Sequence, residues 1–356
     1  MTTVLKQQHP LPAKPRPIVI IGTGGIVTDA HLPAYRKAGF PVAGVFDLDG
    51  ARARKVAQEW EIPRVFDSLD AAATVIPQCV FDVAAPPVAH AAIVAQLPRG
   101  AAVLIQKPLG LDLETATRIR AVCRERGLVA AVNFQLRFAP MMLGVADALQ
   151  RGLLGRLLDI EVHLNLVTPW HLFPHLEPNP RVEIVSHSIH YLDLIRALAG
   201  NPRGVLARTY GHPATALAQT RTSAILDYGN DLRVTLSINH HHDFGRRFQD
   251  ASFRFEGDRG AALVKLGLLL NYPAGEPDEL WLAPRGGPWE QIPLAGSWFP
   301  DAFIGTMSNL QRVAAGEDQV LHSSVEDAWR TMALVEACYR SNAASATPVP
   351  ETAEIP

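Results

Sequence analysis

The fold of this chain is decided by the stretch IVIIGTGGIV at residues 18–27. Apolar residues run into clustered glycines and then into apolar residues again, a pattern typical of a buried strand that turns tightly into a helix. Gly22 permits the tight turn, Gly24 lets the backbone approach a pyrophosphate, and the N-terminus of the helix attracts that anion. The stretch therefore predicts a site for a dinucleotide cofactor.

A second predicted strand, residues 42–46, ends at Asp47, 25 residues after Gly22. A carboxylate at about this separation accepts hydrogen bonds from the adenosine ribose of a bound dinucleotide. Leu48 follows, rather than an Arg or Ser that would accept a 2′-phosphate, so the sequence favours NAD over NADP. An ordinary strand, turn and helix with a surface Asp is the alternative, since Val27 stands where the fingerprint prefers Gly or Ala.

Composition indicates a soluble globular protein of two domains. The chain has 356 residues, of which 48% are hydrophobic and 19% charged. Its 33 basic and 35 acidic side chains leave a net charge of -2, which predicts neither nucleic-acid nor membrane partners. The cysteines, Cys79, Cys123 and Cys338, have neither metal-ligand spacing nor a disulfide framework. We therefore expect a cytoplasmic protein.

The first half of the chain alternates between strand and helix patterns. Residues 1–17 hold four prolines and are expected to be a disordered tail. The following segment, 18–138, predicts parallel strands joined by crossover helices, which is a doubly wound α/β Rossmann domain. The expected strands are 18–21, 42–46, 80–84, 103–105 and 129–133, and the expected helices are 25–38, 50–60 and 113–126.

The pattern changes after Phe138, where several strands follow one another without intervening helices. This arrangement predicts an α+β domain with an open, mainly antiparallel sheet at 139–345, followed by a C-terminal tail at 346–356. The exceptions are predicted helices at 183–199 and 324–341. The expected strands are 158–164, 206–210, 222–228, 232–238 and 251–256.

Two segments carry candidate catalytic chemistry. Lys107 follows the strand that ends at Ile105, so it is expected at the mouth of the cofactor crevice, where an ammonium can stabilise a developing oxyanion. Pro108 restricts its backbone and could be cis. In the helix 183–199, the side chains of Glu183, His187, His190 and Asp193 share one stripe, and histidine suits proton transfer near neutrality. A plain loop and two ordinary helix histidines are the structural alternatives.

These residues, in this order, resemble the glucose-fructose oxidoreductase/inositol dehydrogenase (Gfo/Idh/MocA) family. The resemblance spans about residues 18–345, and any single motif is weak whereas the ordered set is specific. The motifs are Gly22-Thr23-Gly24-Gly25, Asp47, Ala85-Pro86-Pro87 with His90, Lys107-Pro108, Asn133 with Arg137-Phe138 and Pro140, His190 with Asp193, and Ala337-Cys338-Tyr339-Arg340-Ser341.

The resemblance implies NAD(P)-dependent oxidation or reduction of a sugar, polyol or related hydroxy compound, by a homodimer or homotetramer whose outer sheet face carries the subunit contacts. It also implies that Lys107 and His190 are the catalytic pair. The expected substrate-binding residues are Ser186, His187, Asp193, Arg137 and Trp170. The expected cofactor-binding residues are Gly22, Thr23, Gly24, Gly25, Ile26, Asp47, Pro86, His90, Gln106, Lys107 and Gln135.

Two positions depart from the family pattern. Gln106 replaces the Glu that is common before Lys-Pro, and Ser186 stands four residues before His190, where many members carry an Asp. Glu183 or His187 could take over from that Asp, or Ser186 could act through water. Arg137 is expected either to reach the substrate or to form a structural salt bridge, and the latter is favoured.

Other features leave alternatives open. The run His240-His241-His242 invites a metal interpretation, but alternate side chains of a strand point to opposite faces, so we expect a polar strand end and no metal site. The leading hypothesis is an NAD-dependent sugar or polyol dehydrogenase, which could take an aldose to its lactone. The alternatives are an NADP-dependent carbonyl reductase, an NAD-using glycosidase or a non-catalytic nucleotide sensor.

Overall fold

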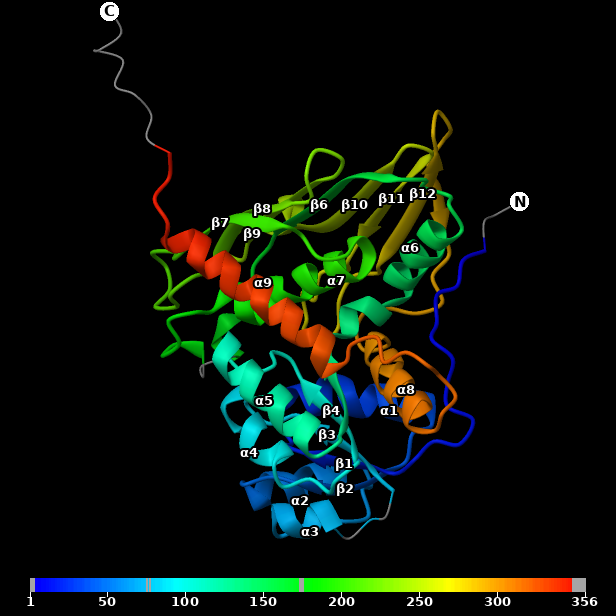
Figure 1. Cartoon of the computed structure of the whole chain (residues 1–356), viewed down its shortest axis with the longest axis vertical. Coiled ribbons are helices and arrows are strands. Elements are labelled where there is room, and N and C mark those ends of the chain that lie inside the picture. The colour runs from blue at the N-terminus through cyan, green and yellow to red at the C-terminus, as the bar shows by residue number, and fades with distance from the viewer. Residues whose placement is uncertain (1–3, 75, 77, 173–175, 348–356) are drawn as a thin grey trace, which may run out of the picture.

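Two sheets organise the chain, one in each domain (Figure 1). The computed structural model describes residues 4–74, 76, 78–172 and 176–347. A five-stranded sheet with the order β2-β1-β3-β4-β5 forms the N-terminal domain, and all of its neighbouring strands are parallel. An eight-stranded sheet forms the second domain. The predicted fold class, a Rossmann domain followed by an α+β domain, is confirmed.

The parallel sheet is built from short apolar strands that are buried on both faces, as expected where helices cover a sheet on both sides. Every residue of β1, β3 and β4 is buried. The strands predicted in this domain are confirmed to within a residue or two. Their bounds are β1 Ile18–Ile21, β2 Val42–Phe46, β3 Val80–Val83, β4 Ala102–Gln106 and β5 Val129–Asn133.

Helices from both ends of the chain cover this sheet. Helix α8, Ala302–Ala314, comes from the C-terminal part of the chain, yet its Phe303, Met307 and Leu310 pack with Ile18 and Ile20. Sequence analysis did not find α8, although apolar residues at this helical spacing were available to indicate it. The other helices are α1 Leu32–Ala38, α2 Gly50–Glu59, α3 Leu69–Thr74, α4 His90–Val94 and α5 Leu113–Glu125.

The second sheet has the order β13-β12-β11-β10-β6-β9-β8-β7. Its strands are antiparallel except for β6 and β9, and buried residues alternate with exposed ones along most of them, so one face is packed and one faces outward. Strands β11 to β13 were not predicted. The bounds are β6 Leu157–Asn165, β7 Gly204–Tyr210, β8 Arg221–Asp227, β9 Arg233–Asn239, β10 Asp250–Gly257, β11 Gly260–Lys265, β12 Glu279–Pro284 and β13 Glu290–Ile292.

Three helices lie between this sheet and the Rossmann domain (Figure 1). They are α6 Pro140–Gln150, α7 Ile189–Ala199 and α9 Val325–Ala343. The predicted helix 183–199 is present, but its first part, Ile184–Ser188, is a π-helical turn. Such wide turns are rare and are frequent at functional sites. Among the described residues, no helix is long and apolar enough to cross a membrane.

The N-terminal segment corrects one expectation. Residues 4–17 do not form the expected disordered tail but run along the protein surface with their own contacts. Leu5 is buried, the side chain of Gln7 bonds to the backbone of Pro293 and Ala295, and Arg16 bonds to Ala314. Composition did not reveal these contacts because each joins residues more than 280 positions apart. The expected C-terminal tail lies mostly outside the described residues.

Candidate functional site

Gly22 forms the turn that follows β1. Its φ is +98°, and a Cβ added there would lie 2.8 Å from the backbone of Ala84 and Ala85 at the end of β3. Only glycine is compatible with both constraints. At Gly24 a Cβ would meet no protein atom within 4 Å, so this backbone faces open space. Gly25 and Ile26 begin the helix that follows. A glycine turn beside an open helix N-terminus fits the pyrophosphate of a dinucleotide.

Asp47 lies at the end of β2, close to this turn. One oxygen of its carboxylate accepts hydrogen bonds from the backbone amide and hydroxyl of Thr23, at 2.7 and 2.9 Å. The other accepts a 2.7 Å bond from Arg52, in α2. Burial opposes ionisation of Asp47, but these hydrogen bonds hold its pKa below the usual value. Arg52 was missed, although its place one helical turn after Asp49 is a readable signal.

Two other expected cofactor residues come from the segment after β3. Pro86 is exposed and precedes a short 3₁₀ turn, Pro87–Ala89. His90 is fully buried, and its Nε2 lies 2.9 Å from the carbonyl oxygen of Ala85. Burial lowers the pKa of His90 to about 4. The neutral ring of His90 therefore holds the backbone that packs against Gly22, rather than presenting a charge to solvent.

Gln106 is the last residue of β4, and Gln135 lies two residues after the end of β5, so both are at the carboxyl ends of parallel strands. Both are buried, and the amide oxygen of each lacks a hydrogen-bond partner in the described part of the chain. Buried polar atoms are rarely left unpaired in a native protein. Two unpaired amide oxygens at the edge where dinucleotides bind therefore fit a cofactor with donor groups, as a nicotinamide carboxamide has.

Lys107 extends from the end of β4 towards the second domain. Its Nζ donates a 2.7 Å hydrogen bond to the carbonyl oxygen of Ser186, in the π-helical turn. The Lys107–Pro108 peptide bond is cis, as the sequence suggested. Burial lowers the pKa of Lys107 to about 8, so the ammonium form still dominates at neutral pH. A hydrogen bond between domains thus brings Lys107 to the helix that carries His190.

His187 and His190 share the surroundings of Lys107. Burial is the main cause that lowers the pKa of both imidazoles well below 6.5, and the positive charge of Lys107 lowers both further. Their Nδ1 atoms are buried and have no hydrogen-bond partner among the described residues. Both rings are therefore neutral at pH 7 and able to accept a proton. In the structure, Lys107 is close enough to His190, the other residue of the expected catalytic pair, for its charge to lower the pKa of that imidazole.

Trp170 and His240 complete the cluster. The ring of Trp170 contacts those of His187 and His240 edge to face, at 5.0 and 5.4 Å between centroids. His240 lies 3.3 Å from a carboxylate oxygen of Glu183, and its other nitrogen is 2.7 Å from the hydroxyl of Thr168. Sequence analysis expected His240 at a polar strand end, but its pairing with Glu183 required the tertiary structure.

Asp193 has a different partner from the one expected, whereas Arg137 forms the salt bridge that the sequence favoured. Asp193 is bound by Arg137 through two hydrogen bonds and by the hydroxyl of Thr331 at 2.8 Å. Side-chain exposure is 1% for Asp193 and 9% for Arg137. Both oxygens of Asp193 are occupied, so it does not orient His190, whose Nδ1 has no partner. A structural ion pair, the favoured alternative for Arg137, is what the structure contains.

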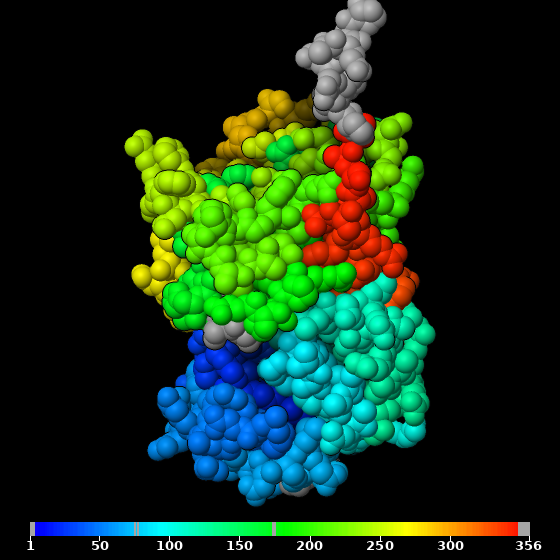
Figure 2. Space-filling view, turned by 90° about the vertical axis from the view of Figure 1, so that its left-hand side faces the viewer, coloured from blue at the N-terminus to red at the C-terminus, as the bar shows by residue number. Residues whose placement is uncertain are grey.

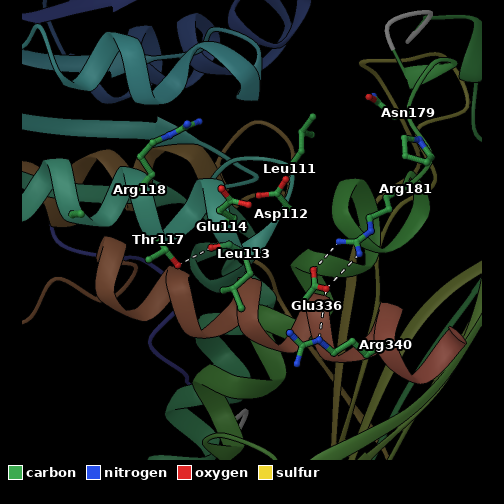
Figure 3. Close-up of a pocket in the computed structure, with 12 residues that line it drawn as sticks. Leu111, Asp112, Leu113, Glu114, Thr117, Arg118, Asn179, Arg181, Glu336 and Arg340 are labelled. Carbon is green, nitrogen blue, oxygen red and sulfur yellow. Dashed lines mark hydrogen bonds and ion pairs between the residues drawn. The ribbon is translucent and has the colours of Figure 1, made fainter. Parts of the chain in front are cut away.

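The surface is hollowed between the two domains, where the blue and cyan surface of the Rossmann domain meets the green surface of the second domain (Figure 2). A separate groove of about 930 Å³ lies between α5, residues 179–181 and α9 (Figure 3). Arg181 and Glu336 form an ion pair across one side of it. None of the residues expected at the catalytic or cofactor site lines this groove.

Comparisons with known proteins agree with this geometry. Residues 16–134 match the model of the Gfo/Idh/MocA oxidoreductase family, described as having an NAD-binding Rossmann fold. The chain is 24% identical over 332 residues to D-apiose dehydrogenase of Paraburkholderia graminis, covering 89% of this chain and 85% of that protein. The family model covers the Rossmann domain of this chain, and the relatives named here are oxidoreductases.

Two other relatives extend the comparison. D-xylose 1-dehydrogenase (NADP(+)) 2 of Haloferax volcanii is 26% identical and covers 67% of this chain and 74% of its own length. The crystal structure of an Agrobacterium radiobacter oxidoreductase with NAD+, L-tartaric acid and magnesium has a TM-score of 0.77 at 20% identity, over 93% of this chain and 97% of that one. The latter likeness supports the Gfo/Idh/MocA fold along almost the whole chain.

Proposed function

We propose that this protein is an NAD-dependent dehydrogenase of the Gfo/Idh/MocA family that oxidises a hydroxyl group of a sugar or polyol. The single observation that carries the proposal is the meeting of Lys107 and His190 beside the cofactor edge of the Rossmann sheet. One is an ammonium held by the Ser186 carbonyl, and the other is a neutral imidazole with an unpaired nitrogen. Sugar-directed relatives, D-apiose and D-xylose dehydrogenases, support the substrate class.

The chemistry follows from these two groups. The substrate hydroxyl binds between Lys107 and His190, and neutral His190 accepts its proton as a general base. Lys107 donates a hydrogen bond to the same oxygen and stabilises the negative charge that develops on it. A nicotinamide, when bound, supplies the acceptor for the hydride that leaves the carbon. Ser186 and His187 border this position, and the Trp170 ring provides an apolar wall for a sugar.

The cofactor residues are those of the glycine turn and the strand ends. Gly22 to Ile26 receive the pyrophosphate, Asp47 receives the adenosine ribose, and Gln106 and Gln135 bind the carboxamide end. We propose NAD rather than NADP because the carboxylate of Asp47 is ionised and repels a 2′-phosphate. Arg52 is a cation at the same place, but its charge is directed at Asp47.

The proposal is tested by mixing purified protein, NAD+ and individual sugars or polyols and following the absorbance of reduced nicotinamide. Formation of NADH that is lost in His190→Ala supports the proposal. The reverse assay, NADPH with ketoses or sugar lactones, tests the carbonyl reductase alternative. Cleavage of glycosides without net NADH would indicate a glycosidase, and NAD binding without any turnover would indicate a nucleotide sensor.

We also propose a homodimer or homotetramer, joined through the outer face of the eight-stranded sheet, in the cytoplasm. This face carries ion pairs between neighbouring strands, such as Arg233 of β9 with Asp159 of β6, and exposed apolar residues, among them Leu206 and Ile225. Cytoplasmic location is supported by three cysteines that are all free and buried. Light scattering of Ile225→Glu against the parent protein tests the assembly, and cell fractionation tests the location.

A further inference from the structure

The catalytic cluster carries an uncompensated positive charge. The hydrogen bond that Lys107 makes is to the neutral carbonyl of Ser186, and no carboxylate of the described residues forms an ion pair with it. Its pKa is shifted by burial alone, without an acidic neighbour to oppose the shift. A buried ammonium without a counter-ion is an expensive arrangement.

The residues around Lys107 add no negative charge. The positions next to it in sequence and in space are Gln106 and Ser186, both neutral. His187 and His190 are cationic when protonated, and the charged neighbours that shift their pKa values are Lys107 and other histidines. The part of the site that receives the reacting hydroxyl is therefore electropositive.

Among the described residues of the cluster, Glu183 is the carboxylate, and its oxygens already have hydrogen-bond partners. Its side chain is fully buried and accepts hydrogen bonds from Ser188 at 2.7 Å and from Thr222. His240 lies 3.3 Å away. Burial raises the pKa of Tyr191 and the charge of Glu183 raises it further, whereas burial alone lowers the pKa of Lys107. Glu183 neither reaches the substrate nor neutralises Lys107.

We propose that the substrate itself supplies the missing negative charge, as a sugar acid whose carboxylate is on the carbon next to the reacting hydroxyl. An ammonium has three donors, and Ser186 takes one of those of Lys107. The two others suit the hydroxyl and carboxylate oxygens of a 2-hydroxy acid. This inference rests on the proposed function and narrows its substrate class from sugars and polyols to aldonic acids.

The reaction balances as a two-electron oxidation. The carbinol C–H bond breaks and its hydrogen leaves as hydride to NAD+, while the O–H proton goes to His190 and the C–O bond becomes a carbonyl. R–CHOH–COO⁻ and NAD+ thus give R–CO–COO⁻, NADH and a proton. The single negative charge of a carboxylate equals the single positive charge of Lys107. A phosphate ester would bring more negative charge than the described residues of the cluster can neutralise.

The first experiment compares matched acids and neutral sugars. D-gluconate and D-galactonate are tested against D-glucose, D-galactose and D-gluconamide, both for NADH formation and for binding to the NADH complex by calorimetry. We expect the acids to be favoured roughly 10- to 100-fold in kcat/KM or in Kd, the value of a hydrogen bond to a charged group. Glucose 6-phosphate is included as the phosphate arm.

The second experiment moves the negative charge into the protein. Ser186→Asp places a carboxylate on the residue whose carbonyl holds Lys107, and Ser186→Asn is the control of the same size without charge. The quantity compared is kcat/KM for an acid divided by kcat/KM for the matching neutral sugar. We expect Ser186→Asp to reduce this ratio about tenfold or more and Ser186→Asn to leave it unchanged.

The outcomes separate this inference from the proposed function. Acids that bind more tightly than neutral sugars, with no NADH formed from any acid, sugar or polyol, support a carboxylate site beside Lys107 and overturn the dehydrogenase proposal together with the oxidation of aldonic acids. Oxidation of neutral sugars with the same kcat/KM as their acids overturns the inference and leaves the dehydrogenase proposal standing. An acid-to-neutral ratio of kcat/KM that is unchanged in Ser186→Asp has the same consequence. Preference for glucose 6-phosphate, or no binding of any acid, also overturns it.

Discussion

The ammonium of Lys107 and the carbonyl oxygen of Ser186 lie 2.7 Å apart, across the boundary between the two domains. Lys107 follows the carboxyl end of β4 in the parallel sheet. Ser186 lies in a π-helical turn directly before α7, which carries His190. This contact brings Lys107, the proposed oxyanion stabiliser, to the segment that leads into the helix of His190, the proposed proton acceptor.

Removing either catalytic group is expected to slow the reaction without removing the cofactor. His190→Ala and Lys107→Ala should each lower kcat about 10²- to 10⁴-fold, the usual contribution of general acid–base assistance. Tryptophan fluorescence quenching by NADH measures cofactor affinity in the same variants, and we expect a much smaller change. Lys55→Ala, an exposed lysine on α2, is the matched control. Near-parental turnover in both variants would contradict the assignment.

The pH profile should be bell-shaped. His190 must be neutral to accept a proton, and burial holds its pKa well below 6.5, so the acidic limb of kcat/KM is expected well below the pH at which a free imidazole titrates. Lys107 must be protonated, and burial lowers its pKa to about 8, so activity should fall as the pH rises through that value. Stopped-flow rates across this range provide the measurement. A profile that is flat between about pH 7 and 10 would show that the ammonium is not required.

Cofactor choice should depend on Asp47. In Asp47→Ser the carboxylate that binds Thr23 and Arg52 is lost, so kcat/KM with NAD+ should fall roughly 10- to 100-fold. Arg52 is then free to pair with a 2′-phosphate, and kcat/KM with NADP+ should rise. Adding Arg52→Ala to Asp47→Ser should abolish that gain. Steady-state kinetics with both cofactors decide the matter, and unchanged NADP+ kinetics in Asp47→Ser would refute this account.

The buried ion pair of Arg137 and Asp193 should matter for stability. Asp193→Ala leaves the guanidinium of Arg137 buried with Asp327 as its remaining acidic partner, and breaking a buried pair costs about 3–5 kcal/mol of unfolding free energy. Urea denaturation measures this loss. Arg124→Ala breaks an exposed pair with Glu326 and should change stability little. Equal losses in the two variants would mean that Asp193 is not structurally important.

Two glycines of the turn should separate folding from cofactor binding. Gly22→Ala introduces a Cβ at a φ of +98° and 2.8 Å from the Ala84 backbone, so it should lower both stability and NAD affinity. Gly24→Ala adds a methyl group in open space, so the melting temperature should be kept while NAD affinity falls. Thermal unfolding and calorimetric titration with NAD+ distinguish the two. Tight NAD binding by Gly24→Ala would show that no pyrophosphate approaches that residue.

Much of the Rossmann domain could be predicted because its signals are local. Each buried strand, such as 18–21 or 129–133, is a short apolar run beside a turn, and Asp47 and Lys107 directly follow such runs. Strands β11 to β13 and α8 were not predicted. The covering of the first sheet by α8 joins residues almost 300 positions apart, and no local pattern indicates such a contact.

The sequence by itself determined the strands of the Rossmann domain, the glycine turn and the identity of the reactive side chains, because these depend on backbone preference and apolar periodicity over a few residues. Only the tertiary structure decided which partner each polar side chain has. Asp193 lies one helical turn from His190 but pairs with Arg137, and Ser186 offers its carbonyl, rather than its hydroxyl, to Lys107. Several polar partners of the same chemical type are present in the sequence, and only the packing of distant segments determines which of them lies within hydrogen-bond distance.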